Sequence, residues 1–201
     1  FDYMVGNRIL MHASKVIALN KKEAEQIKKM GVENVKIEII PNGIDISEYS
    51  NLPCKGEFKK KYSIKENERI ILYLGRIHKI KGVDLLIEAF SLLCCKLDNI
   101  KLVIIGPDNG FLPTLKKQIN NYKLENKVLF LGPLYGRDKL EAYVDADVYV
   151  LPSRYETFPI SVLEAAVCGT PVVITDRCGI VDIVEGKLGY VSEFNAYSLM
   201  N

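Results

Sequence analysis

The feature that most constrains the fold is a regular alternation of short apolar runs with longer segments of helical periodicity. The apolar runs are residues 69–75, 100–106, 127–132, 147–151 and 171–175. The helical patterns between or after them are residues 83–96, 113–122, 138–145 and 160–168. Runs that are apolar at nearly every position are typical of strands buried on both faces, and helical crossovers join parallel strands. The sequence therefore predicts an α/β, Rossmann-like doubly wound parallel sheet, whose ligand lies at the carboxyl ends of the strands.

The first 62 residues show a looser pattern of the same kind. Residues 15–20 and 35–40 are strand-like, and residues 21–30 have helical spacing. The sequence PNG at 41–43 turns the chain, and residues 58–62 predict a short basic helix. A last strand is predicted at residues 188–191.

Composition excludes several classes of protein. The chain is 48% hydrophobic and 26% charged, which suffices for a normal core, and its net charge of +2 is too small to indicate nucleic acid. No apolar run is long enough to span a bilayer. The five cysteines form no paired CxxC motif, which argues against a disulfide framework or a zinc site and favours free thiols in a reducing cytoplasm. Three of them (Cys94, Cys95 and Cys168) fall on apolar helix positions and are expected to act as small hydrophobes.

Three loops follow predicted strands, and the first of them carries residues suited to anion binding. Arg76 and Lys81 stand in a loop that leads to a helix start at residue 83, and two cations beside a helix amino terminus suit a diphosphate. Without further support, a solvated basic loop is the simpler interpretation. Gly106 opens the second loop to close backbone approach, and Asp138 is placed to cap the helix that follows the third.

The strongest local feature is the segment LPSRYETFPISVLEAAVCGTPVV, residues 151–173. Glu156 stands in its loop and Glu164 on its helix, eight positions apart. A two-carboxylate hydrolase is conceivable, but one helix and its entry loop seldom supply both members of such a pair. Carboxylates also accept hydrogen bonds from vicinal hydroxyls, as in ribose recognition, and that role suits both positions better. His78, in the basic loop, is interpreted as a solvated residue rather than a proton carrier.

Several motifs in this order resemble the carboxyl-terminal domain of family-4 retaining glycosyltransferases, which have the two-domain GT-B architecture. They are GRIHKIKG, EAF, IIGPDNG, VLFLG, the segment above, and GYV, over about residues 35–191. PNGID at 41–45 resembles the crossing between the two domains. Residues 1–40 are then expected to end the amino-terminal acceptor domain, and residues 41–201 to form a nucleotide-sugar-binding Rossmann-like domain, truncated at its carboxyl terminus. The absence of an initiator Met also predicts a piece of a longer enzyme.

The resemblance implies roles for individual residues. Arg76 and Lys81 would hold the donor diphosphate, Glu156 the hydroxyls of the transferred sugar, and these three are the implied catalytic residues. Glu164 would accept hydrogen bonds from the ribose. The implied nucleotide-sugar-binding residues are Gly75, Arg76, Lys81, Gly106, Phe130, Leu131, Gly132, Glu156, Phe158, Pro159, Ile160 and Glu164. No metal and no cofactor are expected.

Pro159 departs from the family pattern, which usually has glycine at this position. Proline has no N–H and fixes φ, so a main-chain contact to the donor is in doubt here and donor choice is expected to differ. Proline is compatible with the helix start predicted at residue 160.

The implied reaction is sugar transfer from a nucleotide-diphosphate sugar to an acceptor hydroxyl with retention of anomeric configuration. The acceptor (a glycan, a lipid or a small molecule) would bind through the absent amino-terminal domain. The enzyme would be cytoplasmic, and that domain could contact the inner face of the membrane. The alternatives are a nucleotide-sugar epimerase, a pyridoxal-phosphate-dependent phosphorylase, or a nucleotide-binding module without activity of its own. A dinucleotide-dependent dehydrogenase is disfavoured because the strand-end loops lack GxGxxG.

Overall fold

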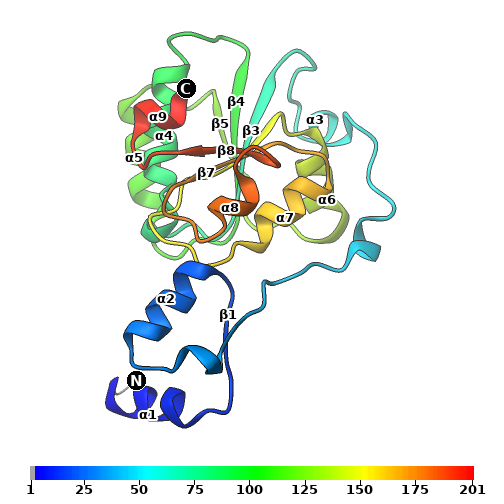
Figure 1. Ribbon diagram of the computed structural model, residues 1–201. Helices are drawn as coiled ribbons and strands as arrows, with labels where there is room; N and C mark the ends of the chain where they lie inside the picture. Colours follow the sequence, from blue (N-terminus) through cyan, green and yellow to red (C-terminus); the bar gives the residue numbers. More distant parts are fainter. Residues whose placement is uncertain (1–2) are drawn as a thin grey trace.

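A small body and a large body make up the chain (Figure 1). The computed structural model describes residues 3–201, with side chains from residue 6 onward. The small body comprises α1 (Tyr3–His12), β1 (Val16–Ala18), α2 (Lys21–Lys29), the 3-10 helix η1 (Asn34–Lys36) and β2 (Ile37–Ile39). β1 and β2 pair in parallel, and residues such as Val16, Ala18 and Ile27 form its separate apolar core.

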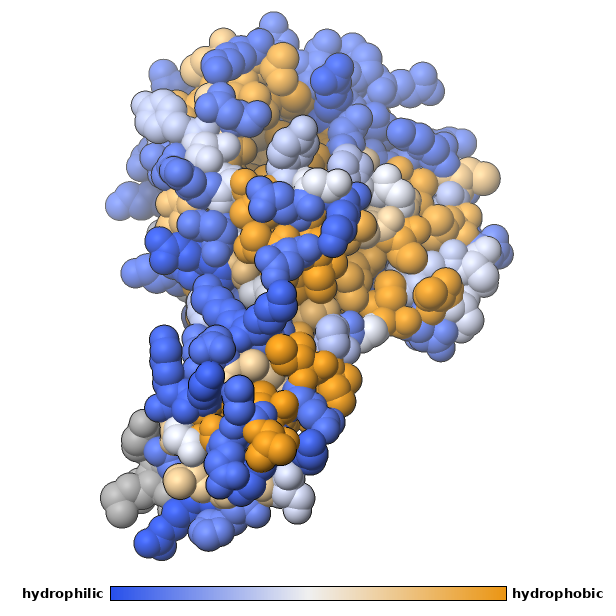
Figure 2. All heavy atoms as spheres, in the orientation of Figure 1, coloured by the Kyte–Doolittle hydropathy of each residue, from blue (hydrophilic) through white to orange (hydrophobic). Residues whose placement is uncertain are grey.

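One face of the small two-stranded sheet is uncovered in the described part of the chain. Along β1, Val16 and Ala18 are buried whereas Ile17 between them is 59% exposed. Ile39 of β2 is 46% exposed too, but it pairs with Ala18 and so lies on the opposite face from Ile17. Figure 2 shows apolar surface on the small body close to where it meets the large one.

The large body is built on a sheet whose order is β5-β4-β3-β6-β7-β8 within the described residues. Its strands are β3 (Arg69–Leu74), β4 (Ile100–Ile105), β5 (Val128–Phe130), β6 (Val148–Leu151), β7 (Val172–Thr175) and β8 (Gly189–Ser192). Every neighbouring pair is parallel. The order reverses between β3 and β6, so the carboxyl ends of these two strands form the topological switch point. The prediction of a doubly wound parallel sheet is confirmed.

Helices cover both faces of this sheet (Figure 1). The helices of one face, which contact one another through α4, are α4 (Val83–Leu93), α5 (Leu112–Asn121) and α9 (Ala196–Met200). The helices of the other face, which contact one another through α6, are α3 (Glu57–Lys61), α6 (Gly136–Asp145) and α7 (Ile160–Val167). The short helices η2 (Ile46–Tyr49), η3 (Lys79–Lys81) and α8 (Val181–Val184) lie in the connections.

Burial explains why the central strands could be found from the sequence. β3 and β4 are buried at nearly every position, with Leu72, Tyr73, Leu102 and Ile104 all at 0% exposure. Strands covered by helices on both faces carry apolar residues without alternation, as the sequence predicted. Together with most of the helices they form one large core, and a small separate cluster that includes Leu85, Ala89 and Ala196 joins α4 to α9.

Two predictions about single residues were wrong. Asp138 does not cap α6, because that helix starts at Gly136 and the cap position is Tyr135; Asp138 lies in the first turn, 2.6 Å from Lys61 Nζ. Cys95 is not a buried helix residue, because α4 ends at Leu93 and leaves Cys95 exposed.

The remaining cysteine expectations agree with the structure. Cys168 is buried and Cys94 is partly buried against the core. All five thiols are free. Among residues 3–201, no helix combines the length and apolarity needed to cross a membrane.

Candidate functional site

A hollow of about 260 Å³ lies at the switch point, where β3 and β6 end. Its lining brings together seven predicted site residues and three further ones. The predicted residues are Gly75, Arg76, Lys81, Glu156, Phe158, Pro159 and Ile160, and the further ones are Leu74, Leu151 and Ser161. Two loops far apart in the sequence thus converge at the edge where ligands bind in open parallel sheets.

The first wall of the hollow is the loop that follows β3. Gly75 N–H donates to Ile105 O at 2.9 Å, and the buried Tyr73 hydroxyl donates to Arg76 O at 2.8 Å. Burial, and secondly the nearby charge of Glu156, raises the pKa of Tyr73, so this phenol stays protonated and keeps donating. The backbone of the loop is therefore fixed at the position from which the Arg76 side chain projects.

The two cations of this loop differ in their surroundings. Arg76 is exposed, and its side chain makes no hydrogen bond or ion pair within the described part of the chain. Lys81, in η3, forms an ion pair with Glu156, and each of these two side chains is only 17% exposed. The hollow thus contains one free cation and one cation that is shared with a carboxylate.

The second wall is the loop from β6 into α7. Glu156 O accepts from Gly179 N–H at 2.8 Å, which ties the loop to the segment after β7. Pro159 is the residue before α7, with extended backbone (φ −79°), so it precedes the helix without interrupting it. The position agrees with the predicted compatibility of proline with a helix start.

The first turn of α7 borders the hollow through Ile160 and Ser161. The Tyr149 hydroxyl donates to Leu74 O at 3.1 Å, and the Ser161 hydroxyl lies 2.8 Å from the same oxygen of Tyr149. This chain of contacts joins the end of β3 to the start of α7. N–H groups in the first turn of a helix lack intrahelical partners and carry partial positive charge. With Arg76 and Lys81 they make the hollow suitable for an anion.

Glu164 does not line the hollow. It lies one helical turn further along α7 and faces α6, where its carboxylate contacts Lys139 Nζ at 2.8 Å and the Tyr143 hydroxyl at 3.0 Å. Its side chain is 15% exposed. Burial and, secondly, the charge of Glu164 raise the pKa of Tyr49, the last residue of η2. The predicted contact of Glu164 with ribose stays a prediction.

The other predicted residues outside the hollow lie at the ends of β4 and β5. Gly106 N–H donates to Gly132 O at 2.8 Å. Gly106 has φ +145°, and a Cβ at this position would overlap with the carbonyl group of Gly75. Glycine is thus required here for the close approach of two strand ends, whereas approach of a donor remains untested. Phe130 and Leu131 are partly buried beside this edge.

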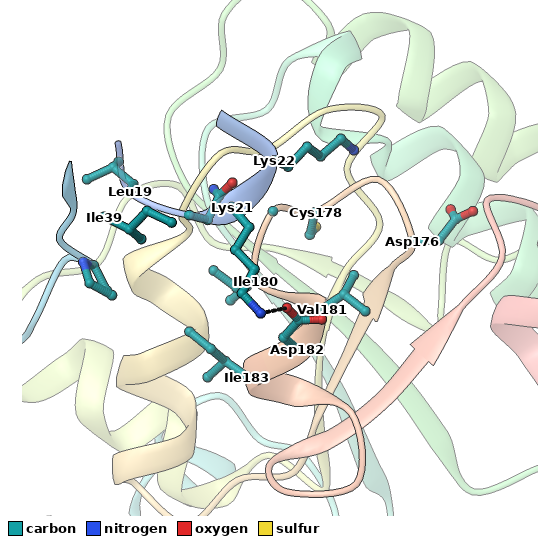
Figure 3. Close-up of a pocket in the computed structure, with 13 residues that line it drawn as sticks. Leu19, Lys21, Lys22, Ile39, Asp176, Cys178, Ile180, Val181, Asp182 and Ile183 are labelled. Atoms are coloured by element: carbon teal, nitrogen blue, oxygen red, sulfur yellow. Dashed lines mark ion pairs between the residues drawn. The ribbon is translucent and has the colours of Figure 1, made fainter. Parts of the chain in front are cut away.

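The small body contacts the large one next to Glu156. Asn20 accepts from Glu23 N–H at 2.8 Å as the cap of α2 and donates from Nδ2 to Thr157 O at 2.8 Å. Beside this joint lies a second hollow of about 430 Å³ (Figure 3). Its lining includes Leu19, Lys21 and Ile39 from the small body, with Ile180, Asp182 and Ile183 from the large one. An ion pair crosses this hollow, in which Lys21 Nζ lies 3.8 Å from Asp182 Oδ2.

Arg154 and Ser161 belong to the surroundings of the site but were missed by the sequence analysis. Arg154 stands two positions before Glu156, and Ser161 directly follows Ile160. The sequence offered one signal for them, because both lie in residues 151–173, the segment that carries Glu156. The partner of Arg154 is Asp84, 70 positions away, which only the fold brings near.

The fold and the hollow define a Rossmann-like α/β protein with a cationic site at its switch point. Residues 55–199 match the family described as glycosyl transferases group 1, and the chain belongs to this family.

Curated relatives are similar along most of this chain. An uncharacterized glycosyltransferase of Methanocaldococcus jannaschii is 34% identical over 180 residues, which are 87% of this chain and 45% of the relative. N-acetyl-alpha-D-glucosaminyl L-malate synthase of Bacillus anthracis is 30% identical over 179 residues, which are 89% of this chain and 46% of the relative. The chain therefore spans about half the length of the curated relatives it matches.

Solved structures share the fold. Anabaena HepE in complex with UDP-glucose superposes with a TM-score of 0.88 at 25% identity, covering 99% of this chain and 56% of that one. WaaG, a glycosyltransferase involved in lipopolysaccharide biosynthesis, gives a TM-score of 0.82 at 26% identity, covering 92% and 51%. The predicted GT-B type of Rossmann-like sheet is confirmed.

Proposed function

We propose that this chain supplies the donor-binding part of a family-4 retaining glycosyltransferase, which transfers a sugar from a nucleotide-diphosphate sugar to an acceptor hydroxyl. The observation that carries the proposal is the convergence of Arg76, Lys81 and Glu156 on one hollow at the start of α7. The resemblance of the fold to HepE in complex with UDP-glucose supports a donor of this kind. The named relatives are a glycosyltransferase and a synthase, which disfavours the epimerase and phosphorylase alternatives.

The arrangement suits departure of a diphosphate. The bond between the anomeric carbon and the diphosphate oxygen breaks, and negative charge develops on the leaving phosphate. Arg76 and Lys81 place positive charge on that group, and removal of one such preorganised group costs about 2–4 kcal/mol of transition-state stabilisation. Glu156, held beside Lys81, accepts hydrogen bonds from hydroxyls of the transferred sugar. Retention requires the acceptor oxygen to bond on the face that the diphosphate leaves, and the proton of the acceptor hydroxyl then passes to the departing phosphate oxygen.

The proposal places the nucleoside between Glu164 of α7 and the carboxyl end of β5. Glu164 contacts Lys139 and Tyr143, one through each carboxylate oxygen, and Tyr49 also interacts with it. Because a carboxylate offers about four lone-pair sites, capacity remains for a ribose hydroxyl. The backbone of Phe130, Leu131 and Gly132 then meets the base.

The proposal includes a limited set of partners. The donor is the partner of this chain, and the acceptor binds mainly through the rest of the enzyme. No metal, no other cofactor and no nucleic acid take part. The enzyme works in the cytoplasm, with any membrane contact made by the other domain.

A titration of the chain tests the donor site. UDP, GDP and ADP are added in turn while heat of binding is measured, with the Arg76→Ala/Lys81→Ala double variant in parallel. The proposal expects weak binding of one diphosphate that the double variant loses. An Arg137→Ala variant, which changes an arginine paired with Glu57 on the α3–α6 surface, serves as the control. Equal binding to the wild type and the double variant would refute the site.

Retention is tested on the whole enzyme. Sugars carried on the nucleoside diphosphate that the titration identifies are supplied as donors, and the anomeric proton of the product is followed by NMR from the start of the reaction. The proposal expects the donor's configuration in the first product formed. Inverted product would refute the assignment to a retaining enzyme.

A further inference from the structure

Arg154 joins the two loops of the hollow. It stands on the loop between β6 and α7, two residues before Glu156, and its guanidinium makes two parallel hydrogen bonds to Asp84, both at 2.7 Å. Nη1 also donates to Lys79 O at 2.6 Å, and the Arg154 backbone N–H donates to Ile80 O at 2.8 Å. One residue therefore holds the backbone of η3 at two successive carbonyl groups.

The surroundings of Arg154 strengthen this clamp. The guanidinium carbon lies 5.3 Å from the centre of the Phe194 ring, and the Arg154 and Asp84 side chains are 32% and 25% exposed. Paired ions sheltered from water attract each other more strongly than fully exposed pairs. Next to the clamp, Gly82 has φ +70° and lies so close to Pro152 that any Cβ would overlap with the Pro152 carbonyl. The end of η3 is thus pressed against the loop that carries Glu156.

Lys81 has only one side-chain partner in the described chain, and that partner is Glu156. A bound diphosphate would compete with Glu156 for the same ammonium group. The contacts of Arg154 to Asp84, Lys79 and Ile80 involve no part of Lys81, so they persist when Lys81 changes partner.

We infer that Arg154 is a positioning residue, which holds η3 against the β6–α7 loop so that Lys81 reaches the second phosphate of the donor. The inference rests on the proposed function. A guanidinium suits this role because its planar fork satisfies a carboxylate and a carbonyl at once, whereas an ammonium group is a point charge. Arg154 itself does not touch the donor.

The test compares a nucleoside diphosphate with its monophosphate, which lacks the second phosphate. The base is the one that the titration above identifies, and the pair is written below as UDP and UMP. Dissociation constants for both nucleotides are measured for the wild type, Arg154→Ala, Arg154→Lys, Lys81→Ala and the Arg154→Ala/Lys81→Ala double variant. A charge-assisted hydrogen bond supports roughly a tenfold or greater preference for UDP. Arg154→Ala is expected to lower this preference about five- to tenfold, with UMP binding nearly unchanged, and Arg154→Lys is expected to restore part of it.

The double variant separates positioning from general support of the fold. If Arg154 acts through Lys81, Arg154→Ala lowers the UDP preference of the wild type but changes nothing further in the Lys81→Ala background. Independent losses in the double variant would overturn the inference. Asp84→Asn, which weakens the fork but keeps the size of the side chain, provides an intermediate loss should Arg154→Ala not fold.

The remaining outcomes are also decisive. If Arg154→Ala lowers the melting temperature but keeps the UDP preference of the wild type, Arg154 has only a structural role. This inference then fails, whereas the proposed donor site stands. If the wild type binds UDP and UMP equally well, the diphosphate site of the proposed function fails, and this inference fails with it. Arg137→Ala is the control and is expected to leave the preference unchanged.

Discussion

Replacing Glu156 by glutamine tests whether Glu156 and a bound diphosphate compete for the Lys81 ammonium group. In the structure the Lys81 ammonium is paired with the Glu156 carboxylate, and both side chains are largely buried. A diphosphate that binds Lys81 would place a second anion on the same ammonium group. Glutamine keeps the shape of the side chain and a hydrogen-bonding oxygen, but it removes the competing negative charge.

The size of the effect follows from the geometry. Two anions that each lie about 2.8 Å from one nitrogen are roughly 4.6–5.6 Å apart. Their mutual repulsion is then about 0.7–3.6 kcal/mol per pair of unit charges, for effective dielectric constants from 80 to 20. Because the site opens to solvent, the low end applies. About 1 kcal/mol corresponds to a roughly fivefold change in a dissociation constant.

Calorimetric titration of wild type and Glu156→Gln with UDP and UMP measures this effect. We expect UDP to bind about fivefold more tightly to the variant, and UMP to change little because its phosphate lies further from Lys81. Glu57→Gln, which changes an exposed carboxylate paired with Arg137, is the control. Weaker or unchanged UDP binding by Glu156→Gln would refute the reasoning that Glu156 and the ligand compete for Lys81.

Three further predictions concern stability and thiol chemistry. Gly106→Ala is expected to lower the free energy of unfolding by about 2–4 kcal/mol, because the new Cβ would overlap with the backbone of Gly75. Gly132→Ala should lower it by only about 1–2 kcal/mol, because φ is positive there but no atom lies near the new Cβ. Equal losses of unfolding free energy in urea denaturation would contradict this account. Burial raises the pKa of Cys168 and of Cys178 to about 11, so a thiol reagent at pH 8 should modify the exposed Cys54 well before either of them. Because these two thiols ionise at lower pH in the unfolded chain, stability should fall as the pH rises from about 9 towards 11; unfolding free energies that stay constant over this window would count against it.

The sheet could be predicted from the sequence because its central strands are buried on both faces. The uninterrupted apolar runs of β3 and β4 are a direct consequence of that burial. The helices α8 and α9 were not predicted, because four or five residues contain too few turns to show a periodicity. The equally short α3 was predicted from its cluster of basic residues, which α8 and α9 lack. The capping role given to Asp138 was wrong because several residues near a helix start are chemically able to cap it, and the backbone decides which one lies at the cap.

The site could be predicted in part. Gly75, Arg76 and Lys81 follow one strand, and Glu156 follows another, so the carboxyl ends of a parallel sheet bring them together. Glu164 could not be placed in the same way, since the contact of its helix with α6 turns it towards Lys139. Pairs such as Asp84 with Arg154 join residues 70 positions apart, and no local pattern indicates them.

The central claim is that a nucleotide diphosphate binds at the switch point, and backbone amide NMR of the chain tests it most directly. Amide signals are assigned and followed during a titration with the diphosphate that binds most tightly. The account predicts that the largest shifts fall on residues 75–82 and 156–162, with smaller shifts at 130–132. Shifts that instead gather around the second hollow, at residues 19–22 and 178–183, with none in the two loops, would contradict it.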